Sequence, residues 1–296
     1  MSEYYGCYKG ALIAVHGGAG TQDPRREESA EALAALNNIA SAGMVQLKQG
    51  VPRMEVATYC LRLLEDDPQF NAGLGSALQA DGMARLSAAL MNGEQQTFSG
   101  IVGAQYLKNP SQLVQALQSC RARTLAGPGV DLLARQLNMP ITSVLTEARV
   151  ARWLKYLAAE NYEPYSCYDT VGLIVRDEEG NLTAAASTGG RGFEYPGRVS
   201  DTPTVAGTYA SAYAAICVTG YGEQIVDDAV AARLETRVRD GLSLEAACGK
   251  SFIEARQGQR EYGWIAASKD SWAGCYTTSF MPFTVWGVEG PFVIPR

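Results

Sequence analysis

Histidine is the residue that this sequence most conspicuously lacks, because His16 is the only one in 296 residues. A catalytic triad, a histidine-rich zinc site or a histidine proton relay would each have to use this one side chain. We therefore expect any acid–base chemistry in this protein to depend on a base other than imidazole.

Features of several other protein classes are missing as well. The seven cysteines are scattered and form no C-x-x-C pair, which argues against a disulfide framework and a structural zinc site. The formal charge is −6 and no Lys/Arg block occurs, so a nucleic-acid partner is not expected. No apolar run approaches the roughly 20 residues that cross a bilayer, and residues 1–10 lack a signal-peptide core. The default expectation is a cytoplasmic protein with no membrane partner.

Apolar periodicity and turn residues predict one α+β domain, residues 1–296, with helices layered on antiparallel sheets. Residues 70–92 are interrupted by Gly, Ala and Asn and predict a loop with short strands, and residues 161–169 predict a linker. The predicted strands are 11–15, 100–106, 171–176, 182–187, 208–218, 264–267 and 276–283. The predicted helices are 27–49, 54–65, 110–121, 143–160, 223–239 and 243–256, the last with Ser243 as its N-cap.

A glycine-rich run, HGGAG at residues 16–20, follows the first predicted strand. Glycines in this place can let backbone N–H groups approach an oxyanion or a phosphate. The run is not a Walker loop, because no Lys-Ser/Thr pair follows, and no G-x-S-x-G elbow completes an esterase site. A simple turn that ends the strand explains it equally well.

Thr170 lies where the predicted linker meets a predicted buried strand. A threonine hydroxyl is a poor nucleophile unless a base lies beside it. Cleavage of the bond between Asp169 and Thr170 would give Thr170 a free α-amino group with a pKa of about 7.7–8.0, which could serve as that base. If Arg176 pairs with Leu182 across the following turn, Thr188 lies opposite Thr170. By itself, the segment also fits an ordinary strand threonine and an ordinary cross-strand pair.

Two further segments could handle a charged amino acid. In the loop 196–201, Arg198 would suit an α-carboxylate through bidentate pairing and Asp201 an α-ammonium, although a surface ion pair is the simpler interpretation. At the end of the strand 208–218, Thr219 and the glycine after it could present donors to a developing oxyanion. A plain strand-to-helix turn would explain that segment too.

Taken together, these motifs resemble the plant-type asparaginase/isoaspartyl peptidase family of N-terminal-nucleophile hydrolases, which is related to glycosylasparaginase and taspase. The resemblance extends from the first strand to at least residue 223 and is specific through the order of its motifs. Those motifs are HGGAG (16–20), FNAGLG (70–75), DTVG (169–172), STGG (187–190), GRVSD (197–201) and TGYGE (219–223).

The resemblance implies a four-layer αββα sandwich and an inactive precursor that cleaves itself between Asp169 and Thr170. The fragments 1–169 and 170–296 would remain in one domain, and two such pairs would form a homodimer. Thr170 would be the nucleophile, with its amine as the base. The implied helpers and ligands are Thr188 beside the nucleophile, Thr219 and Gly220 as the oxyanion hole, Asn71 near the nucleophile, and Arg198, Asp201 and Gly222 as the substrate-binding set.

No catalytic cofactor is implied, and the substrate would be a small amino acid or dipeptide. The family's structural sodium would be bound mostly by main-chain carbonyl oxygens, which suit a hard cation. Its loop would fall on Leu64, Glu65, Asp67, Phe70, Ala72 and Leu74. In this scheme His16 is a structural residue in a glycine-rich strand end.

The sequence also departs from the family pattern. Ser87 and Asn92 stand where aspartate is usual, Glu194 where a basic residue is common, and Ser200 where glycine is usual. Asp169, rather than glycine, precedes the nucleophile, as in glycosylasparaginase and taspase. Three interpretations therefore stay open. The protein is an asparaginase/isoaspartyl peptidase, an enzyme with glycosylasparaginase-like or taspase-like specificity, or an unprocessed and non-catalytic member of the family.

Overall fold

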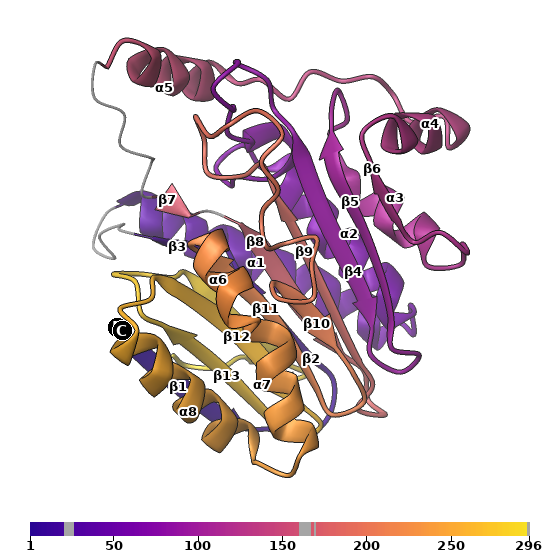
Figure 1. Ribbon diagram of the computed structural model, residues 1–296. Coiled ribbons are helices and arrows are strands. Elements are labelled where there is room, and N and C mark those ends of the chain that lie inside the picture. The colour runs from indigo at the N-terminus through magenta and orange to yellow at the C-terminus, as the bar shows by residue number, and fades with distance from the viewer. Residues whose placement is uncertain (21–26, 160–166, 169, 295–296) are drawn as a thin grey trace.

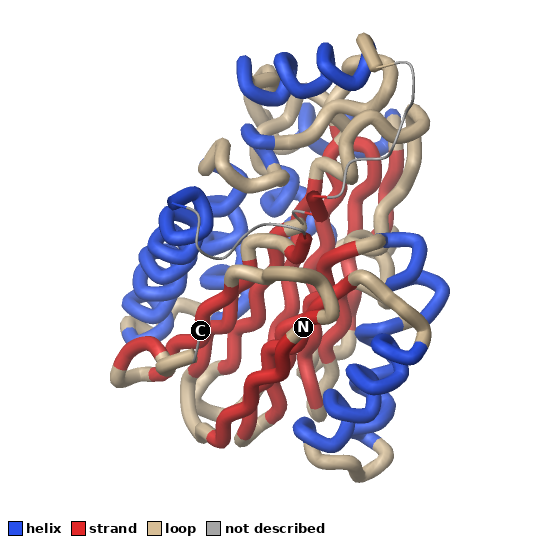
Figure 2. The backbone as a smooth tube through the Cα atoms, turned by 90° about the vertical axis from the view of Figure 1, so that its left-hand side faces the viewer, coloured by secondary structure: helices blue, strands red, loops and turns tan. Residues whose placement is uncertain are grey.

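The protein folds into two stacked β-sheets that lie between two layers of helices (Figures 1 and 2). The computed structural model describes residues 1–20, 27–159, 167–168 and 170–294. This arrangement is the α+β domain that apolar periodicity predicted and the four-layer αββα sandwich that the family resemblance implied. None of the helices within the described residues combines the length and the apolarity needed to cross a membrane.

The larger sheet has eight strands in the order β15-β14-β2-β8-β9-β4-β5-β6. In that order they span Gly290–Pro291, Phe283–Gly287, Leu12–His16, Val171–Arg176, Leu182–Thr188, Leu86–Asn92, Thr97–Ala104 and Thr124–Ala126. Its outer face is covered by α1, α2 and α3, which span Glu27–Lys48, Arg53–Asp66 and Pro110–Leu117. The shorter helices α4 and α5, at Pro128–Gln136 and Glu147–Leu157, lie at the periphery (Figure 1).

The smaller sheet has five strands in the order β1-β13-β12-β11-β10. They span Ser2–Cys7, Ser271–Tyr276, Tyr262–Ser268, Ala214–Gly220 and Thr208–Ala210. The helices α7 and α8, at Val230–Arg239 and Leu244–Gln257, cover its outer face, and α6 at Gly222–Asp228 follows β11. A short ladder joins β3 (Ala19–Gly20) to β7 (Cys167–Tyr168).

Side chains along the central strands point alternately to opposite faces of the larger sheet. They therefore contribute to two apolar cores, one against the helices α1 and α2 and one between the two sheets. In β2, Ile13 and Val15 face the helices α1 and α2, whereas Leu12 and Ala14 face the smaller sheet. The strand period of two therefore places apolar side chains on both faces of each buried strand. A continuous apolar run such as residues 11–15 is what a strand between two apolar layers requires.

Several predicted elements end at different places from those expected. Residues 70–92 contain a full seven-residue buried strand, β4, in addition to the short 3₁₀ helix at Gly73–Gly75. The predicted strand 208–218 is two strands, and the predicted strand 276–283 is wrong, because β13 ends at Tyr276 and β14 begins at Phe283. The predicted helix 223–239 divides into α6 and α7 at Ala229, whose φ is +47°. The elements β1, β6 and α4 were not predicted.

Gly172 illustrates how tightly the sheets meet. It pairs with His16 between β2 and β8, and a Cβ there would lie 2.4 Å from His16 Nε2 and 2.9 Å from Cys217 Cβ. We expect Gly172→Ala to lower the free energy of unfolding by about 1–3 kcal/mol, because the added methyl group overpacks the core. Denaturant titration would measure it. The control is Gly129→Ala in α4, where the nearest contact is Leu125 at 3.8 Å, and an equal loss there would contradict this explanation.

Candidate active site

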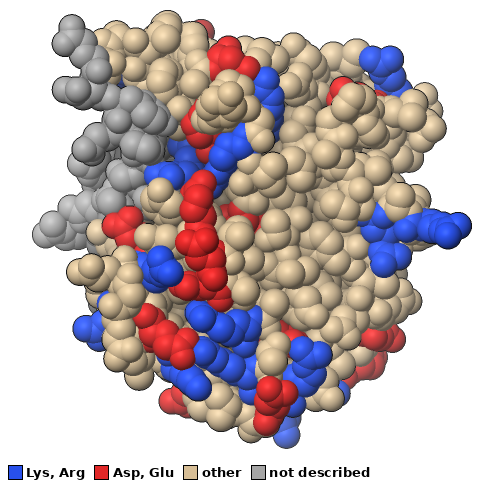
Figure 3. All heavy atoms as spheres, viewed as in Figure 1, with Lys and Arg blue, Asp and Glu red and all other residues tan. Residues whose placement is uncertain are grey.

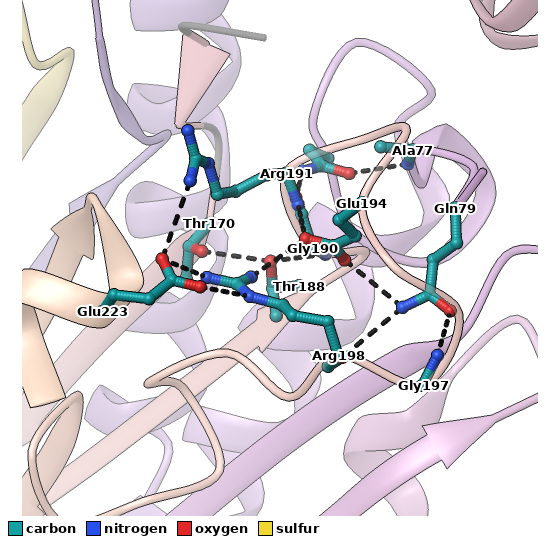
Figure 4. Close-up of polar contacts among 11 residues, drawn as sticks. Ala77, Gln79, Thr170, Thr188, Gly190, Arg191, Glu194, Gly197, Arg198 and Glu223 are labelled. Atoms are coloured by element: carbon teal, nitrogen blue, oxygen red, sulfur yellow. Dashed lines mark hydrogen bonds and ion pairs between the residues drawn. The ribbon is translucent and has the colours of Figure 1, made fainter. Parts of the chain in front are cut away.

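The two predicted threonines meet at the open end of the β8–β9 hairpin. The ladder pairs Arg176 with Leu182 and Val171 with Ser187, which confirms the predicted register. The hydroxyl of Thr170 donates to Thr188 Oγ1 at 3.0 Å, and both residues are buried (Figure 4). The backbone N–H of Gly190 also donates to Thr188 Oγ1, at 3.1 Å. The turn after β9 therefore orients the hydroxyl that faces Thr170.

Thr219 and Gly220 end β11 close to the same point. The backbone N–H of Ala19 donates to Thr219 Oγ1 at 3.2 Å, and Ala19 pairs with Tyr168, two residues before Thr170. Gly220 has a φ of +136°, and a Cβ there would lie 2.5 Å from the carbonyl oxygen of Glu261. Only glycine fits this position, so the strand turns sharply just where donors for an oxyanion were predicted.

Asn71 holds the turn that follows Thr188. Its amide nitrogen donates to the carbonyl of Gly190, and its Oδ1 accepts from the backbone N–H of Ala77 at 2.7 Å. Its own carbonyl accepts from Gly189 at 2.9 Å. The structure thus places Asn71 against the turn after Thr188, where its amide positions the main chain, and its role near the nucleophile stays a prediction.

Arg198, Asp201 and Gly222 also converge. A Cβ on Gly222 would lie 2.6 Å from Arg198 Nη2 and 3.0 Å from Asp201 Oδ1. Asp201 is 2% exposed, and its Oδ2 has no hydrogen-bond partner within the described part of the chain. Burial raises the pKa of Asp201 to about 7, although the guanidinium of Arg198 opposes this rise. A buried carboxylate with an unused oxygen suits a cationic group such as an α-ammonium.

Arg198 is the centre of an ion-pair network that the sequence analysis missed. Glu223 accepts two hydrogen bonds from its guanidinium, at 2.9 and 3.0 Å, and Glu194 lies 3.2 Å from Nη1 (Figure 4). Arg191 pairs with Glu223 at 3.6 Å and lies over the ring of Tyr221, 4.1 Å from its centre. Glu223 is the last residue of the TGYGE motif at 219–223, and its place in that motif is the signal that could have identified it.

Gln79 is a second missed residue, and it braces the loop that carries Arg198. Its Oε1 accepts from the backbone N–H of Gly197 at 2.8 Å and from Arg85 at 2.7 Å. Its Nε2 donates to Glu194 at 3.3 Å and to the carbonyl of Arg198 at 3.4 Å (Figure 4). Nothing in its sequence context indicated this role, since the contact joins segments more than 110 residues apart.

The predicted sodium loop runs from the end of α2 into the 3₁₀ helix, and its carbonyl groups gather closely. A Cβ on Gly73 would lie 2.2 Å from the carbonyl oxygen of Glu65 and 2.7 Å from that of Lys108. The side-chain carboxyl group of Glu65 accepts hydrogen bonds from the backbone N–H and the hydroxyl of Ser111. Burial raises the pKa of this carboxyl group to about 8. Where the chain is described, no group of three or more His, Cys, Asp or Glu side chains could hold a metal ion. The oxygens nearest Gly73 are the main-chain carbonyls of Glu65 and Lys108, and sodium binding by the predicted loop stays a prediction.

Of the predicted positions His16 and Asp169, the structure describes only the first. His16 is fully buried, and burial lowers its pKa to about 3, so its ring is neutral at neutral pH. Asp169, on the predicted cleavage bond, lies outside the described residues, as does most of the predicted linker.

Comparison with known proteins gives the family. The profile of a family described as asparaginase matches residues 9–286. The chain belongs to this asparaginase family. It is 37% identical over 268 residues to an isoaspartyl peptidase/L-asparaginase from Nostoc, an alignment that covers 86% of this chain and 84% of that protein. It is 32% identical to an isoaspartyl peptidase from Salmonella typhimurium, covering 82% and 84% of the two chains. A plant-type L-asparaginase from Pyrococcus abyssi is 34% identical, with 79% and 82% covered.

The departures from the asparaginase family pattern have structural consequences here. Ser87 lies directly opposite Thr188 in the β4–β9 ladder, next to the threonine pair. Asn92 accepts a hydrogen bond from Arg53 at 2.7 Å, far along the same strand. Ser200 is buried beside Asp201. Glu194 adds a carboxylate to the Arg198 network, so of the four departures it most directly alters the charge around that guanidinium.

Proposed function

We propose that this member of the asparaginase family is an autoprocessed threonine amidohydrolase that cleaves L-asparagine and β-aspartyl dipeptides. The observation that carries the proposal is the buried pair of hydroxyls of Thr170 and Thr188, 3.0 Å apart at the end of the hairpin. The names of the relatives, which are isoaspartyl peptidases and L-asparaginases, support the same substrate class.

Maturation would supply the base. Cleavage before Thr170 would release an α-amino group on the nucleophile itself, with a pKa of about 7.7–8.0. This amine would accept the hydroxyl proton and later return it to the leaving group. The mechanism would need no imidazole, which agrees with a single histidine that is buried and neutral.

Acyl transfer would then follow in two steps. Thr170 Oγ1 attacks the side-chain amide carbon, and the carbon–nitrogen bond breaks with release of ammonia or the amine of the leaving residue. Water then hydrolyses the β-aspartyl ester and frees aspartate and the Thr170 hydroxyl. Thr219 and Gly220 would stabilise the negative oxygen in both steps.

The amino-acid head of the substrate would occupy the Arg198 network. The guanidinium would bind the α-carboxylate, and the Asp201 carboxylate would bind the α-ammonium, with the backbone of Gly222 alongside. Because Arg198 pairs with both Glu194 and Glu223, an entering carboxylate must compete with these groups for its donors. This arrangement favours a zwitterionic amino acid over a residue in the middle of a protein chain.

The experiment that tests this function combines intact mass with a substrate panel. We expect prolonged incubation to convert the chain into fragments 1–169 and 170–296, and the product to hydrolyse asparagine and β-aspartyl-leucine. Hydrolysis of glycosylasparagine alone would favour the glycosylasparaginase-like alternative. A chain that stays whole and inactive would favour the non-catalytic one.

Three further properties belong to the proposal. The carbonyl-rich loop from Leu64 to Leu74 would bind a structural sodium ion, and catalysis would use no cofactor. The processed pairs would form a homodimer, which light scattering would measure. A cytoplasmic location is supported by Cys7, Cys60, Cys120, Cys217, Cys248 and Cys275, which are all free thiols.

Thr188 offers a direct test of the assisting hydroxyl. We expect Thr188→Val to lower kcat by about 10- to 100-fold, because the isosteric side chain removes the partner of Thr170 and leaves the Gly190 N–H without its acceptor. KM should change less. The assay would be normalised to the cleaved fraction, and Thr188→Ser, which keeps the hydroxyl, should retain most activity. Normal turnover by the valine variant would show that the hydroxyl pair has no catalytic role.

A further inference from the structure

The guanidinium of Arg198, which would bind the α-carboxylate of the substrate, is already engaged by carboxylates of the chain itself (Figure 4). Its Nε and Nη2 donate to Glu223, and its Nη1 lies 3.2 Å from Glu194. Each of the three guanidinium nitrogens therefore has an acidic partner before a substrate enters. An α-carboxylate that approaches Arg198 meets two like charges as well as the opposite charge that attracts it.

The two acidic partners of Arg198 differ in how firmly they are held. The side chain of Glu223 is 50% exposed, so a substrate can displace it toward solvent. The side chain of Glu194 is only 9% exposed, and each of its carboxylate oxygens has a further donor. Oε2 accepts from the backbone N–H of Arg191 at 3.1 Å, and Oε1 accepts from Gln79 Nε2 at 3.3 Å. We therefore expect Glu194 to stay beside the guanidinium when a substrate binds.

Glu194 also lies against the turn that orients the threonine pair. A Cβ on Gly190 would overlap Oε1 of Glu194, and the backbone N–H of Gly190 donates to Thr188 Oγ1 at 3.1 Å. The carboxylate of Glu194 thus contacts both the Arg198 guanidinium and the main chain beside Thr188 (Figure 4). Its charge is therefore fixed between the predicted head site and the predicted nucleophile.

The ion-pair network of Arg198, taken together with Asp201, has an excess of negative charge. Arg191 and Arg198 contribute two positive charges, whereas Glu194, Glu223 and an ionised Asp201 contribute three negative ones. A zwitterionic substrate head adds no net charge and leaves this excess in place. A head with a free α-ammonium and an uncharged α-carbonyl adds one positive charge and balances it. Charge complementarity therefore favours the second kind of ligand.

The side of the head site that Glu223 forms leads to solvent. Glu223 lies in the first turn of α6, which also carries Asp227 and Asp228. Figure 3 shows acidic side chains over the position of α6, with basic side chains close to them. Because Glu223 is half exposed, a chain that continues from the α-carbonyl of the substrate would leave the site beside it. The acidic surface there also suits a ligand with a positive charge.

We propose that Glu194 is a specificity-determining residue that adapts the head site to an asparagine whose α-carboxyl group carries no charge, as at the N-terminus of a peptide. The α-ammonium would bind Asp201, and the neutral α-carbonyl oxygen would accept from Arg198 without repulsion from Glu194. Acyl transfer through Thr170 would convert this asparagine and one water into an N-terminal aspartate and ammonia. The inference rests on the proposed amidohydrolase function and adds a substrate class to it.

The wild-type enzyme gives the first test. We compare asparagine with asparaginamide, in which an amide replaces only the α-carboxylate, and we measure ammonia together with the product, aspartate α-amide. We expect the two kcat/KM values to agree within about tenfold near pH 7.5, because the lost attraction to Arg198 is offset by the lost repulsion from Glu194. A stronger preference for asparagine would overturn the proposal without the need for any variant.

Glu194→Gln gives the second test, because glutamine keeps the size of the side chain and removes its charge. We expect the ratio of kcat/KM for asparagine to that for asparaginamide to rise by about tenfold, mainly through a lower KM for asparagine. Both proteins are assayed at one pH, so the ionisation of the substrates themselves cancels from the comparison. The matched control is Glu245→Gln, an exposed glutamate of α8, and its ratio should not change.

The ratio separates a role in specificity from a structural one. Loss of a purely structural contact would change kcat/KM for both substrates equally. An unchanged ratio in Glu194→Gln, with normal cleavage before Thr170, would therefore refute the proposed role of Glu194. If this variant does not mature, the comparison in the wild type decides by itself. Failure of the wild type to hydrolyse asparagine, asparaginamide and β-aspartyl-leucine would instead refute the proposed function.

Discussion

Thr170→Ala is expected to remain a single uncleaved chain and to lose turnover of asparagine and β-aspartyl-leucine by at least about 10⁴-fold. Both effects have one cause, because the variant lacks the hydroxyl that would attack first its own peptide bond and later the substrate. The hydroxyl is buried and bonded to Thr188, and alanine leaves only a small gap, so the fold should survive. Intact mass and ammonia release measure the two effects separately.

The control for this result is Thr170→Ser, which keeps a hydroxyl and should retain some cleavage and turnover. Circular dichroism and thermal denaturation would show whether the alanine variant is folded. If a folded Thr170→Ala protein still cleaves itself and still releases ammonia at the wild-type rate, another nucleophile is at work and the mechanism given above is wrong.

Asp201→Asn is expected to raise KM for asparagine and to lower kcat/KM by about 10- to 100-fold at pH 8. The asparagine side chain keeps the size of Asp201 but cannot provide the negative charge that would hold the α-ammonium group. Asp240→Asn is the matched control, because Asp240 is exposed at the end of α7 and should be neutral to activity.

The same carboxyl group gives a pH dependence with a defined sign. Burial raises the pKa of Asp201 to about 7, so the group gains a proton as the pH falls through 7 and loses its attraction for an ammonium ion. In the wild type, kcat/KM should therefore fall below pH 7 through Asp201 as well as through the Thr170 amine. In Asp201→Asn only the amine limb should remain. Identical acid limbs in the two proteins would rule out this role for Asp201.

Local sequence rules predicted the β8–β9 hairpin, where Thr170 and Thr188 lie. The β8–β9 hairpin begins and ends almost as expected, because an apolar run, a polar turn and a second apolar run fix the register. That register placed Thr188 opposite Thr170, which are bonded in the structure. The N-cap at Ser243 was also correct, since its hydroxyl accepts from Ala246 at 3.2 Å.

Other elements could not be read from local patterns. Residues 70–92 were predicted only as a loop with short strands, because Ser, Ala and Asn are weak strand formers. The full strand β4 exists through its pairing with β5 and β9. The break between α6 and α7 at Ala229 has no glycine or proline to indicate it. At the start of α7 the N–H groups of Ala231 and Ala232 donate to the carbonyls of Ala206 and Val205, contacts with a remote segment that no local pattern indicates.

The sequence by itself determined the family, the α+β fold and the register that pairs Thr188 with Thr170, because the order of motifs and the length of the buried strands can be recognised along the chain. Only the tertiary structure decided the surroundings of Arg198. Glu194 follows β9 and Glu223 lies in the first turn of α6, 29 positions later, yet both pair with one guanidinium. Charge at a site depends on distances between remote segments, and those distances are fixed only when the sheets and helices pack.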